Sequence, residues 1–187
     1  SKLATACADG SIRILDARTG LPLLPTLEQR SPIRMLAFDP PSLRLAAAGE
    51  DGSARILLAA TGQLERTLAH AAPVQAVAFG ADGAWLATGT TNGNVSVWEA
   101  KSGELRHRFE AAGAVFLVAF SPDGKWLAAV ARTQDEETPW AVHVWEAVTG
   151  APLGPPVCRG NRIYSLAFSP DSRRFICATR DNVARVW

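Results

Sequence analysis

The sequence predicts an all-β fold, in which four-stranded antiparallel sheets stack side by side around an axis as an open arc of a β-propeller. Three observations lead to this prediction. An Ala-Phe pair recurs along the 187 residues, short turn sequences recur in the same phase, and turns interrupt every apolar run. A repeat of about 42 residues is typical of propellers, because each repeat there is one four-stranded sheet.

The Ala-Phe pair sets the period of the repeat. Its four phenylalanines follow one another at intervals of 41, 41 and 48 residues. They are Phe38, Phe79, Phe120 and Phe168. A large apolar residue at the end of a later strand recurs at nearly the same spacing along the sequence. It is Leu15, Leu57, Trp98, Trp145 or Trp187. From phenylalanine to the next closing residue is 19 residues in three repeats and 25 in the fourth, so an insertion, placed at 132–139, lies inside that repeat.

Turn sequences divide each repeat into four strands, a to d. One turn follows the Ala-Phe pair, a second carries Asp-Gly or a similar pair, and a third carries Thr-Gly or Ser-Gly. Such dipeptides tolerate positive φ and suit tight hairpins. The resulting sheet has two apolar faces and is stable when it stacks against similar sheets. A helical solenoid is the alternative at this period, but the turns come before the roughly 10 to 12 residues that a helix needs.

The phase of the repeat divides the chain into five parts. They are a partial blade at 1–30, blades at 31–71 and 72–112, a blade with the insertion at 113–159, and a partial blade at 160–187. Both partial blades contain strands b and c, so they cannot complete one another. We therefore expect a fragment of a larger protein, whose remaining blades would cover the end sheets. By itself the fragment should aggregate or stay partly unfolded, because its end sheets expose apolar faces.

Composition and charge narrow the function. The chain is 48% hydrophobic and 20% charged, with a formal net charge of +1, which gives no electrostatic reason to bind nucleic acid or an anionic membrane. No apolar run approaches the roughly 18 residues of a membrane helix. Cys7, Cys158 and Cys177 have no Cys-x-x-Cys spacing, so they are expected to be free thiols or small buried side chains. This use of cysteine favours a reducing, cytoplasmic compartment.

The repeats resemble those of WD-repeat β-propellers over the whole chain, about four and a half repeats in all. Trp98-Glu99 and Trp145-Glu146 stand where the Trp-Asp pair of that family lies. The Ser-Pro-Asp-Gly turn at 121–124 is also typical of the family. The segment 149–156 resembles the last strand of bacterial WD repeats, so the bacterial type of the family is expected.

The resemblance implies a structural hydrogen-bond set of His, Ser or Thr, Asp and Trp within a repeat. His70, Thr90, Asn92 and Trp98 occupy suitable positions, with asparagine in place of aspartate. We expect these four residues to stabilise the fold and not to catalyse a reaction. In the repeat with the insertion, Pro139 stands where the turn acid is expected.

The sequence predicts no catalytic residue, no metal site and no cofactor. It contains no Gly-rich phosphate loop and no nucleophile elbow, and its three histidines are scattered. The recurring aspartates belong to turns. The acidic run at 135–137 is either a solvated loop tip or a site for a cation or a basic partner. An enzymatic propeller remains the alternative to a binding module.

The function predicted from these observations is that of a non-catalytic scaffold for protein partners. The resemblance implies that partners use the face that carries the d–a and b–c loops. Trp140 is out of phase with the other tryptophans and is predicted to be an exposed contact. With the insertion, the predicted contacts are Arg30, Glu50, Thr91, Trp140, Arg159, Arg162 and Arg180. The alternative is a sensory or regulatory propeller attached to a signalling enzyme, such as a Ser/Thr kinase, outside this chain.

Overall fold

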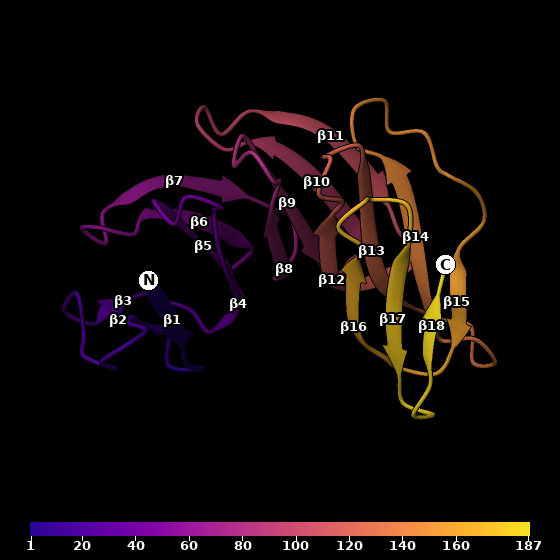
Figure 1. Cartoon of the computed structure of the whole chain (residues 1–187), viewed down its shortest axis with the longest axis horizontal. Coiled ribbons are helices and arrows are strands. Elements are labelled where there is room, and N and C mark those ends of the chain that lie inside the picture. The colour runs from indigo at the N-terminus through magenta and orange to yellow at the C-terminus, as the bar shows by residue number, and fades with distance from the viewer.

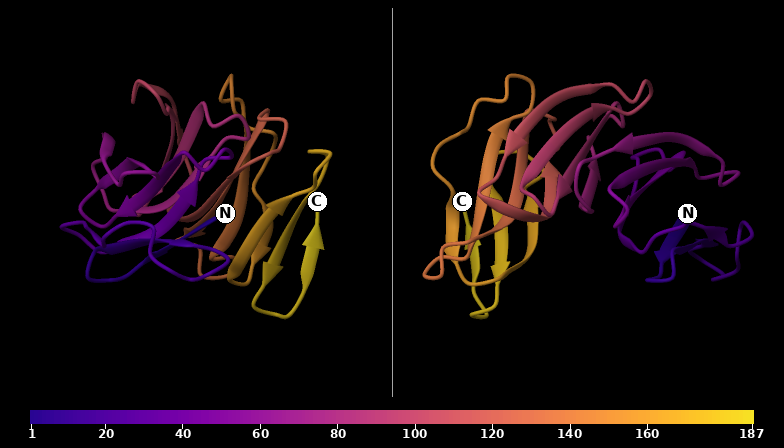
Figure 2. Two further views of the ribbon diagram at one scale, coloured as in Figure 1. Left: turned by 60° about the vertical axis from the view of Figure 1, so that its left-hand side comes forward. Right: turned by 180° about the vertical axis from the view of Figure 1, so that it is seen from behind.

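A computed structural model describes residues 1–187 and contains eighteen strands and no helix. The strands form five antiparallel sheets, which follow one another as an open arc (Figure 1). The two chain ends lie in the two end sheets, and the views in Figure 2 show the same arc from other sides. The predicted all-β propeller arc is therefore confirmed. The structure contains no helix long and apolar enough to cross a membrane.

The five sheets, named I to V here, have the following strands. Sheet I contains β1 (Lys2–Ala6), β2 (Ser11–Asp16) and β3 (Leu27–Glu28). Sheet II contains β4 (Ile33–Phe38), β5 (Arg44–Gly49), β6 (Ser53–Leu58) and β7 (Leu64–Ala69). Sheet III contains β8 (Val74–Phe79), β9 (Trp85–Thr90), β10 (Asn94–Glu99) and β11 (Leu105–Glu110). Sheet IV contains β12 (Gly113–Phe120), β13 (Trp126–Thr133), β14 (Trp140–Glu146) and β15 (Val157–Gly160). Sheet V contains β16 (Ile163–Phe168), β17 (Phe175–Thr179) and β18 (Ala184–Val186).

Within each sheet every strand pairs with the next strand along the chain, so hairpins make all the connections. Glycine is required at some of these hairpins. Gly93 has a φ of +92°, and a Cβ there would come within 2.7 Å of the Ala111 carbonyl oxygen. The hairpin glycine therefore lets the next loop pack directly against the turn.

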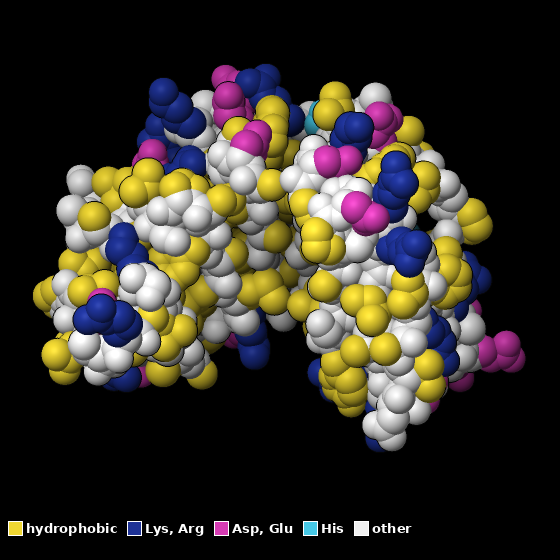
Figure 3. Space-filling model, viewed as in Figure 1, with side chains coloured by type: hydrophobic (Ala, Val, Ile, Leu, Met, Phe, Trp, Pro, Cys, Tyr) yellow, Lys and Arg dark blue, Asp and Glu magenta, His cyan; other side chains and the backbone are white.

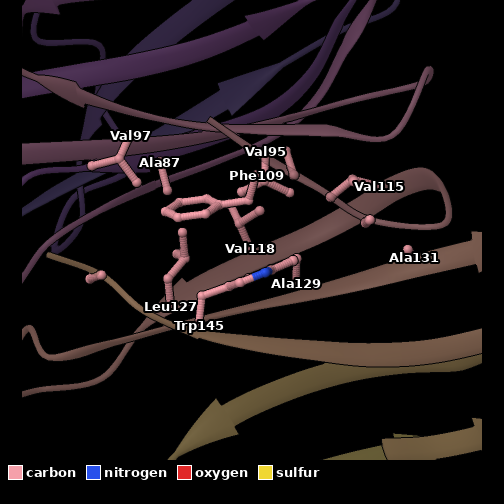
Figure 4. Packing of buried hydrophobic residues seen from close by; sticks show 13 residues of the cluster. Ala87, Val95, Val97, Phe109, Val115, Val118, Leu127, Ala129, Ala131 and Trp145 are labelled. Atoms are coloured by element: carbon pink, nitrogen blue, oxygen red, sulfur yellow. The ribbon is translucent and has the colours of Figure 1, made fainter. Parts of the chain in front are cut away.

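Apolar side chains fill the space between neighbouring sheets. Between sheets III and IV the rings of Phe109 and Trp145 stack with their centroids 5.3 Å apart, and Val118 and Leu127 lie beside them (Figure 4). Similar clusters join the other neighbouring sheets. Burial of apolar surface stabilises a protein by about 25 cal/mol per Å², so these seams dominate the stability of the arc.

A β-bulge recurs at the same place in the first strand of sheets II to V. The register shifts between residues 33 and 35, 74 and 76, 115 and 117, and 163 and 165. The residues that the bulges leave out of the ladder are Arg34, Gln75, Phe116 and Tyr164. Because a bulge turns the extra side chain in a new direction, these four side chains occupy one repeated position.

The insertion lengthens the middle of sheet IV. β13 runs on to Thr133 and β14 begins at Trp140, so residues 134–139 form a projecting hairpin. Thr133 and Pro139 are still joined by a backbone hydrogen bond of 2.7 Å.

The cysteines differ from the prediction. Cys158 in β15 and Cys177 in β17 form a disulfide between sheets IV and V, and Cys7 is free and exposed. The prediction that all three are unpaired was wrong for Cys158 and Cys177. The sequence spacing held no signal, because the two residues belong to different repeats and meet only when the sheets stack.

Candidate functional site

One edge of the arc collects the hairpins between the second and third strands and the connections from each sheet to the next. Backbone hydrogen bonds join the two kinds of loop. The amide of His70 donates to Gly52 O over 2.8 Å, and the amide of Ala111 donates to Gly93 O over 2.8 Å. We call this edge the loop face.

Three predicted contact residues occupy equivalent positions on the loop face. The backbone amides of Glu50, Thr91 and Arg180 each donate to a carbonyl oxygen at the start of the first strand of their own sheet. The acceptors are Pro32 at 3.1 Å, Pro73 at 3.0 Å and Arg162 at 2.8 Å, respectively. This repeated hydrogen bond brings residues from sheets II, III and V to one edge.

The charged residues among the predicted contacts differ in whether they form an ion pair. The Glu50 carboxylate accepts hydrogen bonds from the Arg34 guanidinium, from Nε at 2.6 Å and also from Nη2. Arg30, Arg159, Arg162 and Arg180 are exposed and make no ion pair. Basic and acidic side chains are scattered among apolar ones on the side seen in Figure 3, without a field of one sign.

Trp140 is not an exposed contact, and that prediction was wrong. Its side chain is 8% exposed and belongs to the apolar cluster between sheets IV and V. Its ring centroid lies 5.0 Å from that of Phe116. The insertion lengthens β14 back to Trp140, so the residue begins a strand and faces the seam.

A groove lies between the hairpin of sheet III and the projecting hairpin of sheet IV. Its volume is about 780 Å³. Thr91 and Asn92 form one wall, residues 132–136 and Pro139 the other, and the small residues 111–114 line it between them. Thr91 and the insertion at 132–139 are the predicted contacts that line this groove.

Arg159 lies on the other side of the projecting hairpin. Together with Asp135, Thr138 and His143 it lines a smaller pocket of about 170 Å³. Burial lowers the pKa of His143, and the positive charge of Arg159 lowers it further. The His143 Nε2 atom is buried and has no hydrogen-bond partner. Burial therefore favours the neutral form of this half-buried ring, which stacks on Trp145 with the ring centroids 5.5 Å apart.

The comparisons with known proteins decide the family. The sequence profile of the family described as "WD domain, G-beta repeat" matches residues 62–99, 103–135 and 156–187, more than half of the chain. This chain belongs to the WD-repeat family. A chain in the crystal structure of a mitotic checkpoint complex matches the whole arc with a TM-score of 0.87 and 25% sequence identity. This WD-repeat arc spans only 57% of that chain. No curated protein matches the sequence.

The structural hydrogen-bond set predicted for the WD repeat of sheet III is built around Thr88. The Trp98 indole Nε1–H donates to Thr88 Oγ1 over 3.0 Å, and His70 Nε2 lies 2.8 Å from the same oxygen. His70 Nδ1 lies 3.0 Å from the carbonyl oxygen of Leu68. A carbonyl can only accept, so Nδ1 carries the ring proton and Nε2 accepts from the Thr88 hydroxyl.

Two of the predicted members of that set lie elsewhere. Thr90 Oγ1 donates to Asn92 Oδ1 over 2.6 Å at the hairpin, and neither residue bonds to His70 or Trp98. The four predicted residues therefore form two separate groups: His70 and Trp98 share Thr88, and Thr90 bonds to Asn92. The prediction missed Thr88. A partial signal was present, because Thr88 is one of the two hydroxyl-bearing residues in the otherwise apolar strand Trp85–Thr90.

The turn acids of the WD repeats are structural. Hydrogen bonds from Arg185 and Thr179 hold the pKa of Asp181 well below its usual range. In the repeat with the insertion the turn acid is Asp135, which accepts from Thr138 Oγ1 at 2.6 Å. The prediction from the repeat phase that Pro139 occupies this position was wrong, because β13 is longer than the other second strands. The Thr-x-Asp pattern of residues 133–135 and 179–181 marks both acids.

The loop face contains no arrangement typical of a metal centre. The structure has no group of three or more His, Cys, Asp or Glu side chains placed to hold a metal ion. The chemistry that this face offers is that of hydrogen-bond donors, arginines and a shallow polar groove, which suits recognition of another macromolecule.

Proposed function

We propose that this chain is a non-catalytic scaffold that binds protein partners through the loop face. One observation carries the proposal. The repeated amide-to-carbonyl hydrogen bond brings Glu50, Thr91 and Arg180 from three sheets to equivalent positions on the same edge. A rigid frame that displays variable side chains at a repeated position is suited to binding and not to the convergent geometry that catalysis needs.

The composition and shape of the face support the proposal. Arginine and aromatic residues are enriched at protein interfaces. Three exposed residues of this kind, Arg159, Arg162 and Tyr164, lie close together in the sequence. The exposed Arg180 is joined to Arg162 across the sheet by a backbone hydrogen bond. The groove of about 780 Å³ beside the projecting hairpin adds a concave surface. WD-repeat propellers typically act as interaction modules without catalysis, and the similar chain belongs to a multi-protein complex.

The origin of the chain is a separate proposal. The segment 149–156 favours the bacterial type of the family, and this assignment rests on that segment alone. A cytoplasmic location is likewise a proposal, and it rests on the free thiol of Cys7 alone, because the Cys158–Cys177 disulfide favours an oxidising compartment.

Capture of partners from a lysate by variants of the two edges tests the proposal. The loop-face variant carries Glu50→Ala, Arg162→Ala and Arg180→Ala. The control carries Lys101→Ala, Lys125→Ala and Arg173→Ala, which change exposed charges in the turns of the opposite edge. We expect the loop-face variant to lose partners that the control retains, with melting temperatures close to that of the original protein. Loss of partners by the control alone, or by neither variant, would refute the proposal.

A further inference from the structure

We propose that the junction of sheets IV and V docks an acidic segment of a protein partner. The docking surface, named the arginine patch here, consists of Arg162, Arg180, Arg132 and Tyr164. The inference rests on the proposed binding function and adds the chemistry of the partner: glutamate and aspartate side chains in an extended segment.

The Arg162 guanidinium lies within cation–π distance of two aromatic rings. Its guanidinium carbon lies 5.7 Å from the centroid of the Trp140 ring and 5.3 Å from that of the Tyr164 ring. Trp140 is itself fixed by Phe116 in the seam. A guanidinium that is already stacked loses less conformational freedom on binding than a free one, so it is preorganised for a carboxylate.

The position of Tyr164 follows from the recurring bulge. In sheet V the register shifts between Ile163 and Ser165, so Tyr164 is left out of the ladder. Its side chain is 56% exposed, whereas the equivalent Phe116 of sheet IV packs against Trp140. Sheet V therefore exposes an aromatic ring at the position where the equivalent ring of sheet IV is partly buried.

The arginines of the patch have no acidic partner within the chain. Arg132 lies opposite Trp140 in the β13–β14 ladder, and the Arg180 amide donates to Arg162 O. None of the three arginines makes an ion pair. The adjacent carboxylate of Asp181 is engaged by Arg185 at 2.7 Å. Positive charge therefore remains uncompensated here, whereas Arg34 at the equivalent bulge of sheet II is paired with Glu50.

The local backbone favours recognition by side chains. The Arg180 amide donates to Arg162 O over 2.8 Å, and the Asn182 amide donates to Thr179 O over 3.2 Å. These amides are therefore not free to form the cradle that commonly binds phosphate. Carboxylates that meet stacked guanidinium groups can accept two parallel hydrogen bonds from each. The partner chemistry that fits is thus a run of acidic residues.

Fluorescence anisotropy with defined peptides tests this inference on the full chain. The probe is a fluorescein-labelled peptide of alternating glutamate and serine, and the matched control peptide has glutamine in place of glutamate. We expect the glutamate peptide to bind and the glutamine peptide not to bind. The double variant Arg162→Gln, Arg180→Gln should raise the dissociation constant of the glutamate peptide about tenfold or more. Loss of one good side-chain contact typically weakens binding by about this factor. Arg173→Gln with Arg174→Gln removes the same charge from the opposite edge and should have no effect.

Two further variants separate stacking from charge. Arg162→Lys keeps the charge but loses the planar fork, so binding should weaken. Tyr164→Phe keeps the ring, so binding should persist. Equal binding by the Arg162→Gln, Arg180→Gln variant and the original protein would overturn the inference. So would tenfold tighter binding of a phosphoserine peptide than of the glutamate peptide. If partner capture depends on the loop face while the glutamate peptide does not bind, the docking inference fails and the proposed scaffold function stands.

Discussion

Thr88 and Cys177 hold the same position in β9 and β17, and each ties its sheet to the sheet before it. Thr88 lies opposite Ser96 in its ladder, and Cys177 lies opposite Arg185. Thr88 is hydrogen-bonded to His70 beyond the end of β7, while Cys177 is bonded to Cys158 in β15. A hydrogen bond between sheets in one WD repeat is thus replaced by a covalent bond in another.

Substitution of Thr88 by valine should destabilise the protein by about 1 to 3 kcal/mol, because the buried His70 and Trp98 nitrogens would lose their shared partner. Urea unfolding followed by fluorescence measures the change. Thr67→Val is the matched control on the exposed side of β7 and should change the free energy of unfolding by less than about 0.5 kcal/mol. A Thr88→Val protein as stable as the original would contradict this account of the set.

Acidification should destabilise the protein before its carboxylates titrate. Burial lowers the pKa of His70, and likewise that of His143, from the ordinary value of 6.5. The unfolded chain therefore binds protons first as the pH falls, so stability is complete above the unfolded pKa and is lost below it. The free energy of unfolding should decrease between about pH 7.5 and pH 5.5. His70→Gln should make this decrease shallower, and an unchanged slope would show that His70 is not held neutral.

The Cys158–Cys177 bond should be detectable and stabilising. The bond closes a loop with a sequence separation of 19, for which the stabilisation expected from chain entropy is about 3 kcal/mol. Peptide mapping without reductant should find the linked peptides, and a thiol reductant should lower the urea midpoint. Cys158→Ser with Cys177→Ser should remove the effect of reductant, while Cys7→Ser should leave it intact. Free thiols at all three cysteines in protein prepared without reductant would show that the bond does not form.

Two glycine substitutions separate backbone strain from steric overlap. Gly20 and Gly93 both have positive φ, but nothing lies within 4 Å of a Cβ at Gly20, whereas one at Gly93 would meet the Ala111 carbonyl oxygen at 2.7 Å. Gly20→Ala should therefore cost about 1 kcal/mol from the left-handed backbone alone. Gly93→Ala should cost clearly more and loosen the wall of the groove. Equal melting temperatures for the two variants would contradict the close packing of this hairpin.

Several residues show where inference from the sequence stopped. Thr88 and Thr90 lie two positions apart in β9 and point to the same side, so alternation could not say which one reaches Trp98. Trp140 seemed out of phase only because the length of β14 was unknown. Asp135 was missed as the turn acid for the same reason, since β13 carries two extra paired residues beyond the other second strands.

The sequence by itself determined the all-β class, the number and order of the sheets and the position of the inserted hairpin. Those features depend on turn dipeptides and apolar alternation, which act between residues close together in the chain. Only the tertiary structure decided that Cys158 meets Cys177, that Trp140 is buried beneath Arg162 and that Thr88 joins His70 to Trp98. Each of these contacts depends on how far one element reaches toward another, and stacking of the sheets sets that distance.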